Sequence, residues 1–173
     1  MGKKQKLLLS VAGSLVLTLF LYILLHEGGH TLVALFCGAD IMNFSFFPAH
    51  VSWMGGEFNT FTISLADAAG VGLPILVSVV YMLFYSKENQ NIFYRTFSVI
   101  FSIVPFYSLI AWMILPVMYV NGRKLSDDVI HFIEHSGINP WIVCVTAAAL
   151  FAGGVVLVWK RGILRNYIEI CKK

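Results

Sequence analysis

Charged residues are scarce in this 173-residue chain, where aspartate, glutamate, lysine and arginine together occupy 12% of the positions. A soluble domain carries about 25%. Hydrophobic residues reach 58%, and they fall in long runs. Such runs are typical of helices that cross a lipid bilayer rather than of a core surrounded by water. The net charge of +3 is too small to favour binding to nucleic acid.

Cysteine is also rare, since the three residues Cys37, Cys144 and Cys171 are far apart in the chain. An odd number without a Cys-x-x-Cys pair argues against a disulfide framework. We therefore expect Cys37 and Cys144 to act as small apolar side chains. Internal repeats and low-complexity linkers are lacking as well. The sequence thus predicts one transmembrane domain over residues 1–173.

Four apolar segments are long enough to cross a bilayer, and they predict an all-α membrane protein with four transmembrane helices. Residues 39–61 differ from them, because they contain alternating and aromatic residues, Pro48 and two consecutive glycines. This pattern predicts a β-hairpin or a re-entrant segment after the first span. A short helix over residues 127–135 is expected before the fourth span, with Ser126 as N-cap and Gly137 as its end. The predicted spans are residues 7–37, 64–85, 92–120 and 141–159.

Lysine and arginine are distributed unevenly over the predicted loops. If the N-terminus is cytoplasmic, two of the twelve basic residues, Arg123 and Lys124, lie outside and the other ten lie inside. The positive-inside rule then predicts a multi-pass protein with both termini in the cytoplasm. A helix that starts at Leu7 places His26 about 28 Å further on, near the outer boundary of the membrane core. The loop before the fourth span lies on the same side.

The first span ends with His26-Glu27-Gly28-Gly29-His30. Residues four apart share one face of a helix, so both imidazoles can bind the same metal ion. Glu27 is next to them and can act as general base toward water activated by the metal. Polar groups in an apolar span are costly, which indicates a functional site rather than a solvated helix end.

A catalytic zinc ion usually has three protein ligands and one open position, so a third ligand must come from another segment. Asp40 and Asp67 are expected at the ends of elements, where a capping or surface role is the ordinary explanation. His50, in the predicted hairpin, is a weaker candidate. The richest cluster of candidates lies between residues 126 and 135. It consists of Asp127, Asp128, His131, Glu134 and His135.

This cluster also contains His131-x-x-Glu134-His135, the inverted form of a zinc-binding motif. We rank it second, because it lies between spans, where a solvated amphipathic helix is the ordinary explanation. It also lacks the apolar setting that makes polar residues costly. A helix that presents Asp128 to the metal would leave His131 and His135 as supporting groups around the ligands.

The motif at residues 26–30, at the end of a first span, resembles the site-2 protease family of intramembrane zinc metalloproteases, in a minimal bacterial form. The hairpin-like segment after the motif and the small-residue stretch 68–74 are similar to features of that family. Asp127-Asp128 is similar to an Asn-Asp pair that the bacterial members carry before a helix. This match implies that Asp128 is the third zinc ligand, with Asp127 as the second choice.

The resemblance implies a zinc metalloendopeptidase in a prokaryotic cell membrane. Its substrate would be a membrane-embedded or membrane-anchored protein, and Glu27 would be its catalytic base. The hairpin would pair with an extended substrate as an added strand. The chain departs from the family in one motif, since Asn139-Pro140 is followed by Trp-Ile-Val-Cys-Val and not by a pattern ending in Leu-Asp-Gly. It also has no PDZ or nucleotide-binding domain, and the predicted outer location differs from the cytosolic side used by many members.

Two other functions are compatible with the sequence. One is a catalytically inactive membrane scaffold, against which the intact Glu27 argues. The other is a metal-binding or transport protein of the membrane, against which four short spans without an inverted repeat argue. The sequence indicates neither the substrate nor the oligomeric state.

Overall fold

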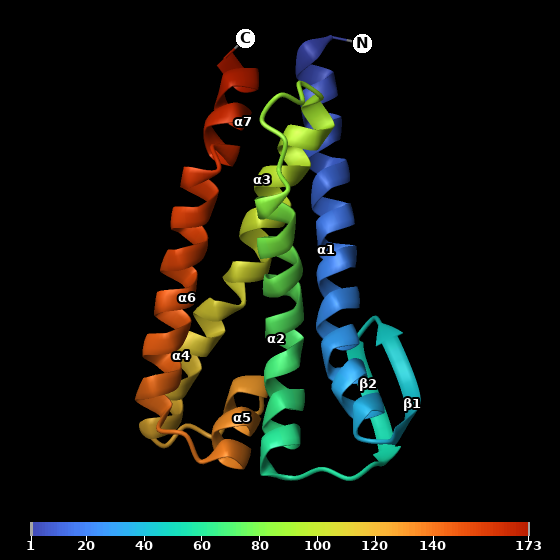
Figure 1. The fold of residues 1–173 in the computed structure, drawn as a ribbon, viewed down its shortest axis with the longest axis vertical. Coiled ribbons are helices and arrows are strands. Elements are labelled where there is room, and N and C mark those ends of the chain that lie inside the picture. The colour runs from blue at the N-terminus through green and yellow to red at the C-terminus, as the bar shows by residue number, and fades with distance from the viewer. Residues whose placement is uncertain (1, 173) are drawn as a thin grey trace.

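The structure, a computed structural model, describes residues 2–172 and is mostly helical (Figure 1). A two-stranded antiparallel sheet follows the first helix, so residues 39–55 form the β-hairpin that the sequence predicted as one of two possibilities. In chain order the elements are α1 (Lys3–Phe36), β1 (Ala39–Phe46), β2 (Ala49–Gly55), α2 (Thr60–Leu83), α3 (Ile92–Tyr107), α4 (Leu109–Val120), α5 (Asp128–Ser136), α6 (Pro140–Lys160) and α7 (Ile163–Lys172).

Four helical segments of the described chain are long and apolar enough to cross a membrane. They are α1, α2, α3 together with α4, and α6. The number agrees with the prediction, and the length and composition of these helices are consistent with a multi-pass membrane protein. With 34 residues, α1 is about 51 Å long, well beyond the roughly 30 Å of a hydrocarbon core. Helix α1 is therefore longer than a helix needs to be to cross such a core.

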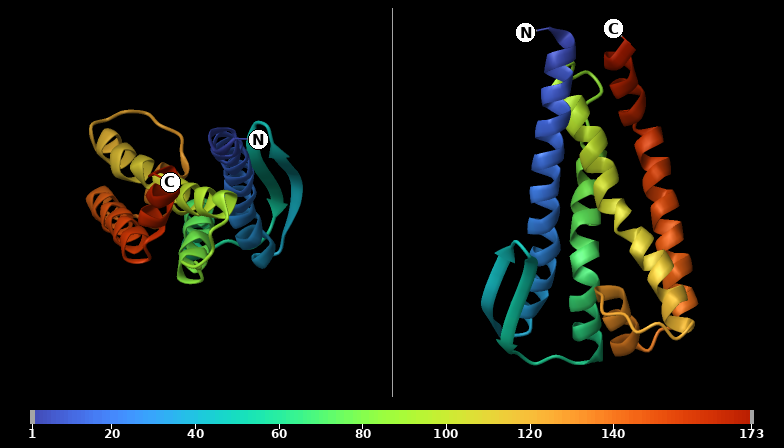
Figure 2. Two further views of the ribbon diagram at one scale, coloured as in Figure 1. Left: turned by 90° about the horizontal axis from the view of Figure 1, so that it is seen from above. Right: turned by 180° about the vertical axis from the view of Figure 1, so that it is seen from behind.

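The third span is broken at Ser108, between α3 and α4. Pro105 has no backbone N–H, so it leaves the carbonyl of Phe101 without its helical partner. The hydroxyl of Ser78 in α2 donates to that carbonyl at 3.1 Å, and the hydroxyl of Ser108 donates to the carbonyl of Pro105 at 2.7 Å. Because these bonds satisfy the backbone, the break is tolerated within a span. Figure 2 shows α3 and α4 running obliquely between the two ends of the molecule.

The hairpin lies beside the C-terminal half of α1 (Figures 1 and 2). Its register pairs Ala39 with Gly55 and Phe46 with Ala49, with one irregularity between Ile41 and Asn43. The ring of Phe46 stacks on Phe20 of α1, with centroids 5.0 Å apart. The hairpin is thereby held against the helix that carries the His-Glu-Gly-Gly-His motif.

The second span begins at Thr60 rather than at residue 64. Asn59 caps α2 by accepting the backbone N–H of Thr62 at 2.9 Å, so the helix starts one turn before the predicted span. As a consequence, Asp67 lies well inside α2. The prediction that Asp67 sits at the end of an element is therefore wrong.

The short helix before the fourth span is present, but its predicted N-cap is wrong. The cap is Asp127, whose carboxylate accepts the backbone N–H of Val129 at 3.3 Å, and not Ser126. Gly137 ends the helix as predicted, with a positive φ of 67° that glycine adopts easily. Three buried side chains hold α5 in a cluster with residues of α4 and α6. They are Val129, Ile130 and Ile133.

Candidate metal centre

His26 and His30 project from one face of α1, and their Nε2 atoms are 3.4 Å apart. The Nδ1 atom of His30 lies 2.7 Å from the backbone carbonyl of Ala66 in α2. A carbonyl only accepts hydrogen bonds, so Nδ1 carries the proton and the lone pair of a neutral ring lies on Nε2. Nε2 is thus the atom with which His30 would bind a metal ion.

Asp128 completes a group of three donor atoms. Its Oδ2 atom lies 3.2 Å from Nε2 of His26 and 3.3 Å from Nε2 of His30. Burial acts to raise the pKa of Asp128, but hydrogen bonds and charge from the two histidines outweigh it and hold that pKa well below its usual range. The carboxylate is therefore ionised at neutral pH, as a metal ligand must be. The three atoms are close enough together to hold one metal ion.

Two glycines allow α1 and α2 to approach each other at this group. A Cβ at Gly70 would lie 2.8 Å from Cε1 of His26 and still closer to Nε2 of His30. A Cβ at Gly29 would lie 2.6 Å from the carbonyl carbon of Ala69 and closer still to its oxygen. Gly28, between the histidines, faces open space. Only Gly29 of the motif glycines is therefore required by the contact between the helices.

The residues that carry the donor atoms line a cavity of about 360 Å³, which is bordered by α1, β2, α2 and α5. Glu27 lines the same cavity and is 5% exposed. The Glu27 side chain therefore borders the same small, partly open space as the atoms that could hold a metal. The other side chains of the wall come from the hairpin and from α2 and α5. They are Ala49, His50, Val51, Trp53, Asp67 and His131.

The remaining sequence candidates fall outside the three-atom group. Asp127, the second choice for third ligand, caps α5 instead, and Asp40 is exposed on β1. His50 lines the cavity wall without joining the group. Glu134 is exposed on α5. Among residues 2–172, His26, His30 and Asp128 form the one cluster that could hold a metal.

The two histidines of the inverted motif on α5 have different neighbours. His131 lines the cavity, with Nε2 3.4 Å from the hydroxyl of Ser126. His135 instead pairs with Asp67 of α2, at 2.7 Å between Nδ1 and Oδ2. Sequence reasoning missed this role of Asp67, although an acid inside an apolar span was an available signal. The part played by the Ala66 carbonyl had no sequence signal, because every residue has such a group.

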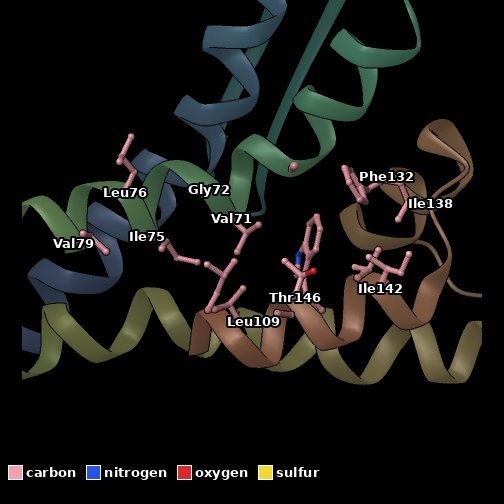
Figure 3. Close-up of a pocket in the computed structure, with 15 residues that line it drawn as sticks. Val71, Gly72, Ile75, Leu76, Val79, Leu109, Phe132, Ile138, Ile142 and Thr146 are labelled. Atoms are coloured by element: carbon pink, nitrogen blue, oxygen red, sulfur yellow. The ribbon is translucent and has the colours of Figure 1, made fainter. Parts of the chain in front are cut away.

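A second cavity, of about 500 Å³, lies between α2, α4, α5 and α6. Its lining is almost entirely apolar, with Thr146 as an exception. Figure 3 shows Val71 and Ile75 of α2 pointing across it toward Leu109 and Thr146. This cavity offers apolar surface and no cluster of titratable groups.

The two cavities are neighbours along both α2 and α5. Asp67 and His131 line the cavity with the three donor atoms, whereas the next residues in the chain, Ala68 and Phe132, line the apolar cavity. A polar space with three donor atoms therefore adjoins an apolar space at one end of the molecule.

Comparison with known proteins adds no family, since no family model, curated protein or solved structure matches this chain. The resemblance to the site-2 proteases rests on the sequence motifs and stays a prediction. A function for the chain has to be inferred from the residues around the two cavities.

Proposed function

We propose that this chain is an intramembrane zinc metalloprotease of the site-2 protease type, which hydrolyses a peptide bond in a membrane-embedded or membrane-anchored protein. The observation that carries the proposal is the spacing of the three donor atoms, at 3.2, 3.3 and 3.4 Å, beside Glu27. Ligand atoms about 2.0–2.1 Å from a tetrahedral zinc ion are about 3.3–3.4 Å apart. The residues of this chain therefore fit such an ion.

The composition of the site also supports catalysis rather than a purely structural role. Structural zinc sites usually have four protein ligands, whereas catalytic sites have three and an open position. Here two imidazoles and one carboxylate face a cavity. A bound zinc ion would supply Lewis acidity, which polarises a peptide carbonyl and makes a coordinated water more acidic.

Glu27 is the residue of this chain placed to move the proton. It lines the cavity beside His26 and His30 but is separate from the three donor atoms. We infer that it takes a proton from the attacking water and transfers it to the leaving amine nitrogen. A glutamine at this position has nearly the same shape but cannot accept that proton.

A substrate has to present an extended backbone, because a helical peptide keeps its carbonyls in internal hydrogen bonds. Strand β2 contributes to the wall of the metal cavity, and within the described residues it pairs with β1 alone. One edge of β2 therefore has no strand partner among the described residues, and its backbone groups could pair with a further strand. This arrangement supports the binding of an extended substrate by strand addition.

The proposal is tested on one set of variants, by measuring cleavage in cells and zinc content in the purified protein. We expect Glu27→Gln to lose cleavage of a co-expressed membrane-anchored reporter by at least about 100-fold, the usual effect of removing a general base. It should retain about one zinc per chain. A variant that combines His26→Ala with His30→Ala should lose both properties. Glu57→Gln, at an exposed position after β2, is the matched control and should change neither.

The alternative explanations of the site predict different experimental results. Full activity in Glu27→Gln would remove Glu27 as the base. Unchanged zinc content in the double histidine variant would remove the metal site itself. Wild-type protein that binds zinc but cleaves no reporter from a broad panel would favour the inactive scaffold.

A further inference from the structure

We propose that Asp67 and His135 form a positioning pair that holds Asp128 against the two histidines; this inference rests on the metal site proposed above. His135 Nδ1 lies 2.7 Å from Asp67 Oδ2, which joins α5 to α2 across 68 positions of sequence. The Asp67 side chain is 12% exposed, whereas that of His135 is 44% exposed. A buried carboxylate has lost most of its contact with water, so its hydrogen-bond partner stabilises it more than a partner stabilises a carboxylate in a surface ion pair.

One short stretch of α2 supports both halves of the metal site. The carbonyl of Ala66 accepts the Nδ1–H of His30 at 2.7 Å, and the next residue, Asp67, binds Nδ1 of His135. The first contact orients a ligand directly. The second holds the helix that carries another ligand. Acceptors that bond directly to a metal-binding histidine, as the Ala66 carbonyl does to His30, set the orientation of its ring.

Asp128 and His135 are seven positions apart on α5, so they lie on the same face of that helix, two turns from each other. The buried apolar residues of α5 pack in a cluster with side chains of α4 and α6. The bond between His135 and Asp67 adds a polar tie to α2. It therefore acts on the face of α5 that presents Asp128 to the histidines.

Helix α5 needs such support because it has only nine residues. Isolated helices of this length are not stable in water. The Asp128 carboxylate has to be kept 3.2–3.3 Å from two imidazole nitrogens while the helix that carries it is short. Loss of the tie should therefore weaken metal binding without abolishing it, and it should do so through Asp128.

The test uses the purified full-length protein with zinc as the only probe, in competition with a chelator of known affinity. We expect Asp67→Ala and His135→Ala each to weaken zinc binding by about tenfold, within the range for groups that support metal ligands. The double variant should be no weaker than either single one. Asp67→Asn keeps an acceptor for the His135 N–H and should restore most of the affinity. Glu134→Ala, the exposed neighbour of His135 on α5, is the control and should bind zinc as the wild type does.

A double-mutant cycle with Asp128→Ala shows whether the pair acts through that residue. In the Asp128→Ala background, adding Asp67→Ala or His135→Ala should change zinc affinity by less than about twofold. A loss of the same tenfold in both backgrounds would overturn the inference, as would unchanged binding in the single variants. His135→Ala alters a half-exposed side chain and keeps the test available if Asp67→Ala does not fold. Wild-type protein that fails to bind zinc would instead refute the proposed function, and the inference with it.

Discussion

At the scale of single residues, the candidate site depends on where side chains are missing as much as on where they are present. His30 and His26 face the backbone of α2 at Gly70, where any Cβ would collide with an imidazole. Gly72, on the same helix, has nothing within 4 Å of the position a Cβ would take. The two glycines are thus close neighbours in the sequence, but only Gly70 has no room for a side chain.

We predict that Gly70→Ala lowers zinc affinity by at least about tenfold, because the added methyl group displaces the imidazoles. In an ordinary helix interior the same change would stabilise the protein by about 0.5–1 kcal/mol. Gly72→Ala is the matched control, and its zinc affinity should not change. Both variants can be compared by chelator competition and by thermal unfolding in detergent. Equal zinc affinity in the two would show that close contact with α2 does not shape the site.

At the scale of elements, α5 decides which of two adjacent aspartates faces the histidines. Asp127 is the last residue before the helix, and its carboxylate accepts the N–H of Val129. Asp128 is the first helical residue, and its carboxylate points to His26 and His30. The start of one helix thus gives two chemically identical side chains different roles.

We predict that Asp127→Ala weakens zinc binding by about 2- to 30-fold, because loss of an N-cap costs about 0.5–2 kcal/mol and loosens the helix that carries Asp128. Asp127→Ser keeps a capping oxygen and should bind zinc nearly as the wild type does. Asp128→Ser should lose most of the affinity. If Asp127→Ser instead lost zinc as completely as Asp128→Ser, Asp127 would be the ligand and the assignment of the pair would be reversed.

At the scale of the whole molecule, the candidate metal site and the chain termini lie at opposite ends. Figure 1 shows the N- and C-termini together at one end, and the hairpin and α5 at the other. At the end with the termini, Arg95 is 2% exposed and donates to the carbonyls of Asn89 and Asn166, which ties α7 to α3. Arg123 and Lys124 lie on the connection between α4 and α5, near the site. The orientation of the protein in its membrane therefore decides which compartment the site faces.

We predict that the termini are cytoplasmic and that the site faces the outer side, because ten of the twelve basic residues then lie inside. Single cysteines at positions 123 and 87 can be introduced into a variant without the three native cysteines. A membrane-impermeant maleimide added to intact cells should label the cysteine that replaces Arg123 and not the one that replaces Lys87. Labelling in the reverse pattern would place the candidate metal site on the cytoplasmic side.

Much of the architecture followed from local patterns. Apolar run length predicted four spans, and alternation with Pro48 and paired glycines predicted the hairpin. The errors were at helix ends, where Asn59 starts α2 earlier and Asp127 replaces Ser126 as the cap of α5. These boundaries were hard to predict, because several neighbouring polar residues can each cap a helix and packing selects among them.

The sequence by itself determined that His26 and His30 share a helix face with Glu27 beside them, because spacing along one helix is a local property. Which residue joins them was decided by the tertiary structure, since α5 approaches α1 only through the packing of α2, α4 and α6 around it. The same packing turned Asp67 toward His135 and brought Gly70 against the imidazoles. Contacts between segments distant in the chain depend on the shapes of several elements at once. No single stretch of sequence encodes them.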